Sequence, residues 1–276
     1  MGDWSNRPRV AVVTGASSGI GLAAAIELGR RGWYVGLLGR DQGRLAAALE
    51  RVHAVASLPP RSFRCDFGSL AEVRSVAAQV REAYPSIDVL ANNAGGNVAA
   101  RRWSRDGFEE TIQVNHLAPF LLSHLLRESL RGGRIVNTSS RVHARGRLDP
   151  DDLNRAARRF ASLRVYADTK QANVLFTIEA TRRWPDILSV AFHPGIVRTR
   201  FGRENAIYRI FWQYAPGLRT PEQGAHTLVY LATAPRASLC PGGYYLDERQ
   251  RTAGARAGQP QLAERLWEAS VKAVGA

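Results

Sequence analysis

A strand, a glycine-rich turn and a helix follow one another near the start of the chain, and this order constrains the fold more than any other feature. The apolar, β-branched run Val10–Thr14 leads into Gly15-Ala16-Ser17-Ser18-Gly19-Ile20-Gly21, and a helical apolar pattern follows. The glycines let the backbone approach a pyrophosphate closely, and a helix N-terminus offers free N–H groups and the positive end of its dipole. The spacing G-x-x-x-G-x-G is a variant of the common G-x-G-x-x-G fingerprint. The strand before it and the helix after it favour a dinucleotide site over a simple tight turn.

Strand and helix patterns alternate along the rest of the chain. They predict an α/β fold with a Rossmann-type doubly wound parallel β-sheet of about seven strands and helices on both faces. Strands are expected near residues 9–14, 33–39, 61–66, 87–92, 133–139, 187–193 and 243–246. Helices are expected near residues 19–31, 41–56, 69–83, 105–130, 162–183, 221–233 and 260–273. We see no repeat, low-complexity run or linker, so residues 1–276 are expected to form a single dinucleotide-binding and catalytic domain.

Tyr166 and Lys170 lie four residues apart, which places them on one face of an expected helix. Lysine is rare in this chain: lysine and arginine together number 38, and only Lys170 and Lys272 are lysines. An ammonium group beside a phenol favours the phenolate and would lower the tyrosine pKa from about 10. The pair is weak evidence by itself, because this spacing often arises by chance on exposed helices. Together with the surrounding motifs it indicates an acid/base catalyst.

Further motifs follow the glycine turn in order. They are Asn92-Asn93-Ala94-Gly95, Val114-Asn115-His116-Leu117, Ile135-Val136-Asn137-Thr138-Ser139-Ser140 and Pro194-Gly195-Ile196-Val197-Arg198-Thr199. With Tyr166 and Lys170, they resemble the short-chain dehydrogenase/reductase family along most of the chain. The Asn-His-Leu run, the long interval from Ser140 to Tyr166 and the pair Leu175-Phe176 are most similar to its retinol-dehydrogenase-like branch.

The resemblance implies a catalytic tetrad of Asn115, Ser140, Tyr166 and Lys170. In carbonyl reduction, Tyr166 would donate the proton and Ser140 would hydrogen-bond the developing oxyanion. Lys170 would tune Tyr166 and hold the nicotinamide ribose, and Asn115 would organise a water that replenishes the proton. The alternatives are that Ser140 caps a strand end and that Asn115 braces its own helix, which the joint match disfavours. For His116 and His193 a structural role is favoured.

The resemblance also implies a cofactor site that includes Tyr166 and Lys170, with Asp66 against the adenine and a Pro-Gly segment that closes over the nicotinamide. Its other members are Gly15, Ser17, Ser18, Gly19, Ile20, Gly21, Arg40, Phe67, Asn93, Ala94, Gly95, Pro194, Gly195, Val197 and Thr199. No metal site is expected.

Arg40 directly follows the expected second strand and bears on the choice of cofactor. An acidic residue near this place would bind the ribose 2′-OH of NAD, whereas an arginine pairs with a 2′-phosphate through charge-assisted bonds. Asp41 complicates this interpretation, yet it also suits the N-cap of the next helix. NADP(H) is therefore favoured over NAD(H), with a plain surface arginine as the alternative.

Residues 197–220 are expected to form a substrate lid over the carbonyl site. The segment is rich in large apolar side chains, namely Phe201, Ile207, Tyr208, Ile210, Phe211, Trp212 and Tyr214. They suit a bulky apolar substrate such as a retinoid, a long-chain aldehyde, a steroid or a polyketide ketone. They would equally suit contact with the protein's own core, a second subunit or a membrane surface.

The formal net charge is +14 at pH 7. Such a charge can attract nucleic acid, anionic membrane or phosphorylated ligands. The arginines are dispersed and no basic run interleaves with aromatics, so compositional bias is favoured and no specific nucleic-acid partner is expected. No apolar stretch reaches 18 residues, no secretory signal is seen, and Cys65 and Cys240 form no metal pattern. A cytoplasmic location is expected.

Together these features predict an NADP(H)-dependent oxidoreductase that interconverts a carbonyl and an alcohol on a bulky apolar small molecule by hydride transfer. The resemblance makes a homodimer possible through the helices that carry Asn115 and Tyr166. The alternative is an NADP(H)-binding regulatory or membrane-surface protein without turnover, against which the intact tetrad argues.

Overall fold

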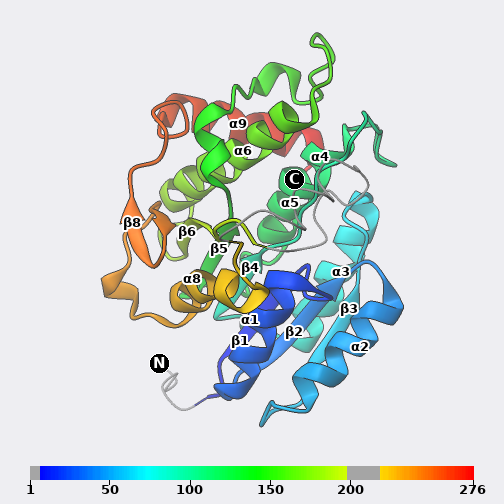
Figure 1. The fold of residues 1–276 in the computed structure, drawn as a ribbon, viewed down its shortest axis with the longest axis vertical. Coiled ribbons are helices and arrows are strands. Elements are labelled where there is room, and N and C mark those ends of the chain that lie inside the picture. Colours follow the sequence, from blue (N-terminus) through cyan, green and yellow to red (C-terminus); the bar gives the residue numbers. More distant parts are fainter. Residues whose placement is uncertain (1–6, 198–217) are drawn as a thin grey trace.

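The computed structural model describes residues 7–197 and 218–276. Within them one sheet runs in the order β3-β2-β1-β4-β5-β6-β7-β8 (Figure 1). Its strands are β1 Val10–Thr14, β2 Tyr34–Gly39, β3 Arg61–Arg64, β4 Val89–Asn92, β5 Arg134–Thr138, β6 Leu188–His193, β7 Tyr244–Leu246 and β8 Arg249–Arg251. Every neighbouring pair is parallel except β7 and β8, which are antiparallel. The Rossmann-type fold expected from the sequence is confirmed.

Strand β8 was not expected from the sequence. Its three residues, Arg-Gln-Arg, are all exposed, so no apolar alternation marks them as a strand. The strand exists because its backbone pairs with β7 at the edge of the sheet, with Tyr244 opposite Arg251. Charged residues of this kind are typical of sheet edges.

The helices are α1 Gly19–Arg30, α2 Gln42–His53, α3 Leu70–Ala83, α4 Glu110–Ile112, α5 Ala118–Leu125, α6 Ser162–Arg183, α8 Pro221–Thr233 and α9 Pro260–Val274. The prediction of one helix over residues 105–130 was wrong. Glu109 caps the first turn by accepting a hydrogen bond from the backbone N–H of Ile112 at 3.0 Å, so the helix starts there. A π-helical turn, η2 Gln113–Leu117, then separates α4 from α5.

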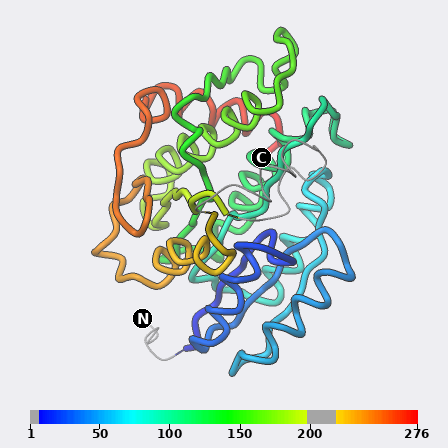
Figure 2. The backbone as a smooth tube through the Cα atoms, viewed as in Figure 1, coloured from blue at the N-terminus to red at the C-terminus, as the bar shows by residue number. Residues whose placement is uncertain are grey.

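Two hydrophobic cores lie on the two faces of the sheet. Helices α1, α2 and α8 cover one face, and α3, α5, α6 and α9 cover the other (Figure 1). Figure 2 shows the red C-terminal helix α9 beside the green α6, although the two are far apart in the sequence. Trp267 of α9 packs edge-on to Phe120 of α5, with ring centroids 5.0 Å apart. Within residues 7–197 and 218–276, no helix combines the length and apolar character that crossing a membrane requires.

Strand β1 pairs with β2 on one side and with β4 on the other. The chain therefore winds outward through β2 and β3 and returns across β1 to reach β4. Ligands of open α/β sheets bind at the carboxyl ends of the strands at such a reversal of strand order. The fold thus places the glycine turn after β1 beside Asn93, Ala94 and Gly95 after β4.

Candidate active site

A cleft of about 590 Å³ opens at this edge of the sheet. It brings together nearly all the residues that the sequence assigned to the cofactor and the tetrad. These are Gly15, Ser17, Ser18, Gly19, Ile20, Arg40, Asp66, Phe67, Asn93, Ala94, Gly95, Asn115, Ser140, Tyr166, Lys170, Pro194, Gly195 and Val197. Thr199, like most of the expected lid, lies outside the described residues.

The glycine turn is fastened to the end of β4. Thr14 Oγ1 accepts hydrogen bonds from the backbone N–H groups of Asn93 and Ala94, both at 2.9 Å. Gly15 has φ +67° and Gly19 has φ +58°, conformations that a side chain disfavours. A Cβ on Gly15 would lie 2.9 Å from the Cα of Ala94. The turn therefore needs glycine both for its conformation and for its close approach to β4.

Gly21 lies beneath the turn, where it is buried in the first turn of α1. A Cβ there would lie 2.5 Å from the carbonyl oxygen of Gly15 and 2.6 Å from Asn93 Nδ2. The sequence assigned Gly21 to the cofactor site, but these contacts are with protein atoms. The absence of a side chain lets the first turn of α1 pack closely on the Gly15 carbonyl and the Asn93 side chain.

Arg40, Asp41 and Arg44 form one end of the cleft, at the carboxyl end of β2. Asp41 caps α2, as its sequence position suggested: its Oδ1 accepts a 2.9 Å hydrogen bond from the backbone N–H of Arg44. Its Oδ2 also lies 3.2 Å from Arg44 Nη2. The bond from the Arg44 N–H holds the pKa of Asp41 below its usual range. The Asp41 carboxylate is thus engaged by Arg44, while Arg40 beside it is exposed.

Asn115 belongs to the π-helical turn η2 and is fully buried. Its Oδ1 accepts from the backbone N–H of Gly96 at 2.8 Å, and its Nδ2 donates to the Gly96 carbonyl at 2.9 Å. The same Nδ2 lies 3.0 Å from Thr169 Oγ1 on α6. The side chain therefore braces the loop after β4 and helix α6, rather than its own helix. π-Helical turns frequently occur at functional sites.

Ser140 and Tyr166 both line the cleft. Ser140 begins the 3₁₀ helix η3, Arg141–Arg145, directly after β5, and its side chain hydrogen-bonds the Tyr166 side chain. Burial raises the pKa of the Tyr166 phenol, and the bond with Ser140 acts in the opposite direction. The sequence predicted a lowered pKa from the neighbouring ammonium. The shift has the other sign because protein atoms surround the phenol and disfavour its charged form.

Lys170 is only 3% exposed. Its Nζ donates to the carbonyl of Thr138 at 3.0 Å and lies 5.4 Å from the centroid of the Tyr166 ring. Burial lowers the pKa of Lys170 to about 8. The ammonium thus lies beside the aromatic ring, held by the end of β5, and it can be charged at neutral pH.

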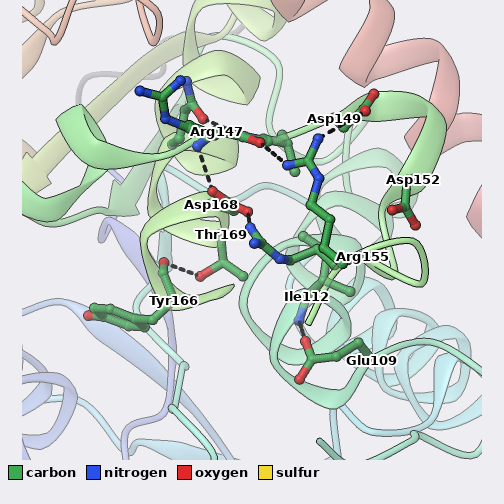
Figure 3. A network of polar contacts seen from close by, with 12 residues as sticks. Glu109, Ile112, Arg147, Asp149, Asp152, Arg155, Tyr166, Asp168 and Thr169 are labelled. Carbon is green, nitrogen blue, oxygen red and sulfur yellow. Dashed lines mark hydrogen bonds and ion pairs between the residues drawn. The ribbon is translucent and has the colours of Figure 1, made fainter. Parts of the chain in front are cut away.

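The backbone that carries Tyr166 is held by a polar network (Figure 3). Asp168 forms a buried ion pair with Arg155 and accepts from the backbone N–H of Arg147 at 2.6 Å. Thr169 Oγ1 donates to the Tyr166 carbonyl at 2.8 Å. Figure 3 shows the Tyr166 side chain pointing away from this network. The network therefore fixes the first turns of α6, and its hydrogen bond to Tyr166 involves the backbone carbonyl rather than the phenol.

The Pro194–Val197 segment forms another wall of the cleft. Gly195 has φ +86°, and a Cβ there would lie 2.5 Å from Arg219 Cδ. Ile196 is 54% exposed, so an apolar side chain faces outward beside the cofactor residues. Arg219 forms a 2.6 Å ion pair with Asp247, which ties this segment to the loop after β7.

Several cleft residues were not assigned to the site from the sequence. Asn97, Val98, Arg102, Glu110, Thr111, Val114, Thr138, Ser139 and His193 also line it. Most follow or flank the recognised motifs, which was the only signal available for them. His193, expected to be structural, is buried, and burial lowers its pKa to about 4, so it is neutral at pH 7. No group of described residues could hold a metal ion.

The sequence and the fold of the chain are similar to those of known proteins. A sequence model of the family "short chain dehydrogenase" matches residues 9–207. A Streptomyces protein named "Putative daunorubicin C-13 ketoreductase DnrU" is 48% identical over 267 residues, covering 97% of this chain and 93% of its own. Human retinol dehydrogenase 13 is 35% identical over 283 residues, and the match covers 97% of this chain and 85% of the human protein.

Among solved structures, an alcohol dehydrogenase from Thermococcus sibiricus complexed with 5-hydroxy-NADP superposes with a TM-score of 0.67. It is 27% identical, and the match covers 83% of this chain and 92% of that one.

Proposed function

Because the chain belongs to the short-chain dehydrogenase/reductase family, with retinol-dehydrogenase-like relatives, we propose that it interconverts a ketone or aldehyde and an alcohol with NADP(H). The observation that carries the proposal is the single cleft that joins the glycine turn to Asn115, Ser140, Tyr166 and Lys170. Such a cleft can hold a dinucleotide and a carbonyl side by side. When bound, the nicotinamide supplies the hydride.

The residues present fit this cofactor. The glycine turn leads into the N-terminus of α1, where backbone N–H groups can bind a pyrophosphate and Gly15 and Gly19 present no side chain. At the other end, Arg40 is exposed while the Asp41 carboxylate is already bonded to Arg44. A ribose 2′-phosphate would meet the exposed Arg40 guanidinium there, whereas the Asp41 carboxylate that could bind a 2′-hydroxyl is engaged by Arg44. The NADP analogue in the Thermococcus sibiricus neighbour supports the same preference.

Tyr166 is the proposed proton donor in carbonyl reduction. Its raised pKa keeps the phenol protonated at neutral pH, as a general acid requires. The Ser140 hydroxyl, hydrogen-bonded to the same phenol, is placed to bond the substrate oxygen. The Lys170 ammonium would stabilise the phenolate left after proton transfer.

The proposed substrate is a bulky apolar small molecule. Relatives named as a ketoreductase and as retinol dehydrogenases support a large hydrophobic carbonyl compound. The exposed Ile196 side chain at the cleft is consistent with such a molecule. A homodimer through α5 and α6 would have to use surface that α9 leaves open, because α9 packs along α6.

The test is oxidation of NADPH, with NADH in parallel, across all-trans-retinal, decanal, a steroid ketone and a polycyclic aromatic ketone. NADPH-dependent turnover is expected with at least one of them. The Tyr166→Phe variant should lose roughly 10²- to 10⁴-fold in kcat and keep its NADPH affinity. Retained turnover in that variant would refute the role of Tyr166. Tight NADPH binding without turnover of any carbonyl would favour a cofactor-binding regulatory protein.

A further inference from the structure

His143 lies three residues after Ser140, within η3, and is 4% exposed. Its two ring nitrogens contact two distant parts of the backbone. Nδ1 lies 2.6 Å from the carbonyl oxygen of Ser140, and Nε2 lies 3.0 Å from the backbone nitrogen of Gly254. The ring thus connects the residue after β5 with a loop 111 positions further along the chain.

The two partners determine the tautomer. A carbonyl oxygen can only accept a hydrogen bond, and a backbone N–H can only donate one. Nδ1 must therefore carry the proton that it donates to Ser140, and Nε2 must be the unprotonated acceptor for Gly254. Both bonds exist together only in the neutral ring. Burial lowers the pKa of His143, which favours that form.

The bond to Ser140 fixes the peptide that follows it. The Ser140 carbonyl accepts from the His143 backbone N–H at 3.0 Å as well as from the ring. Two donors from one residue hold this carbonyl, and they leave Ser140 in an extended conformation with φ −160° and ψ 156°. The backbone orientation of Ser140 sets the direction of its Cα–Cβ bond, and its Oγ also accepts a 3.4 Å hydrogen bond from the Val142 N–H within η3.

The loop at Gly254 is a fixed anchor. A Cβ on Gly254 would lie 2.8 Å from the Cα of Ala144, so the loop is pressed against η3. Its carbonyl accepts from the N–H of Ala257 at 2.8 Å. Ala257 is buried in a cluster with Val174 of α6, Ala191 of β6 and Tyr244 of β7. The loop that bonds the His143 ring is therefore held in place by its packing against α6, β6 and β7.

The elements packed around His143 carry the following titratable and charged groups. From β7, the Tyr244 ring packs edge-on with centroids 4.5 Å apart, and from β6 the nearby titratable group is His193. On η3 itself, Arg141 is close enough to influence both. From α6, the Asp168 carboxylate is engaged by Arg155 and by the Arg147 backbone.

We propose that His143 is a positioning residue, whose neutral ring ties Ser140 to the Gly254 loop and so orients the Ser140 hydroxyl for carbonyl reduction. The inference rests on the proposed function. If Nε2 were protonated, it would face the Gly254 N–H as a second donor, and the hydrogen bond between His143 and Gly254 would be lost. Orientation of Ser140 then depends on a neutral His143.

Two variants separate the two bonds. His143→Asn keeps an amide donor near the position of Nδ1 but is too short to reach Gly254. His143→Gln places an acceptor near the position of Nε2 but loses the donor to Ser140. We expect kcat to fall at least tenfold in His143→Gln and about threefold in His143→Asn, with KM for NADPH nearly unchanged in both. The control is His124→Asn, a substitution of a partly buried histidine on α5.

The pH profile gives a readout that a merely structural role would not move. Wild-type kcat should fall on the acid side below pH 6.5, and this limb should be absent in His143→Asn. Equal kcat in wild type and His143→Gln would overturn the proposal, and so would an unchanged acid limb in His143→Asn. A parallel fall of kcat and melting temperature in both variants would also overturn the proposal.

The ring itself can be examined without turnover. Proton–nitrogen NMR of ¹⁵N-histidine protein, assigned with the His143→Asn variant, should show the Nδ1–H tautomer for His143 at pH 7. An Nε2–H tautomer or a charged ring would refute the inference. If wild type reduced no carbonyl, the proposed function would fail, and the NMR result would still decide whether His143 makes the tie.

Discussion

Asn115 holds Gly96 at both of its backbone groups, accepting from its N–H at 2.8 Å and donating to its carbonyl at 2.9 Å. A side-chain amide carries both the acceptor and the donor that this two-point contact requires, without a charge. Because Asn115 Nδ2 also meets Thr169 Oγ1 at 3.0 Å, one side chain joins the loop after β4 to the helix that carries Tyr166 and Lys170. The cofactor-side and substrate-side walls of the cleft are thus linked through Asn115.

Replacing Asn115 with leucine should damage both stability and turnover. The change removes both hydrogen bonds to Gly96, each of which contributes about 0.5–1.5 kcal/mol to stability. We expect a lower melting temperature, at least a tenfold loss of kcat and weaker NADPH binding. Calorimetry and fluorescence titration would measure these. Gln79→Leu, an exposed change on α3, is the control, and identical behaviour of the two variants would contradict the bracing role.

The rate of carbonyl reduction should fall as pH rises through about 8. Burial lowers the pKa of Lys170 to about 8, so the ammonium is present below that pH and is lost above it. Without the cation, the phenolate of Tyr166 left by proton transfer is less stable. Initial rates at saturating NADPH between pH 6 and 10 would show the limb. Lys170→Arg should be slower, because a guanidinium is larger and forked, but its rate should stay flat across pH 8. If the rate of this variant still fell near pH 8, the titrating group would be one other than Lys170.

Arg40→Ala should weaken the binding of NADPH and leave the binding of NADH nearly unaffected. A charge-assisted bond to a 2′-phosphate contributes about 1.5–3 kcal/mol, which corresponds to roughly a 10- to 150-fold rise in Kd. Titration of both cofactors by fluorescence quenching measures the difference. Arg51→Ala on α2 is a matched surface arginine and should change neither affinity. Equal losses for NADPH and NADH in Arg40→Ala would reject the phosphate contact.

Gly21→Ala should destabilise the fold at the cofactor turn. The new Cβ would lie 2.5 Å from the Gly15 carbonyl, and that contact is with backbone rather than a flexible side chain. Overpacking of this kind costs about 1–3 kcal/mol, so melting temperature and NADPH affinity should both drop. Gly43→Ala is the control, since the Cβ there would have Asp41 Oδ1 at 3.8 Å as its neighbour and alanine favours a helix. If Gly21→Ala were as stable as Gly43→Ala, the close packing of α1 on the Gly15 carbonyl would not be required.

Features with a local pattern were predicted well. The strands β1, β2, β4, β5 and β6 are apolar and buried, so each could be expected to within about two residues. Strand β8 has no such pattern, since only pairing with β7 defines it. The helix expected at 105–130 was wrong because a cap at Glu109 and the π-helical turn η2 are decided by hydrogen bonds, not by apolar periodicity.

The sequence by itself determined which chemical groups are present and in what order: the glycine turn, Asn115, Ser140, and Tyr166 four residues before Lys170. That information is local, because helix period and turn conformation act over a few residues. Only the tertiary structure decided the environment of these groups. Desolvation raises the pKa of Tyr166, the Thr138 carbonyl holds Lys170, and Gly254 reaches His143 across 111 positions. Such effects depend on which distant atoms exclude water from a site or approach within hydrogen-bond distance, and sequence spacing carries no record of that.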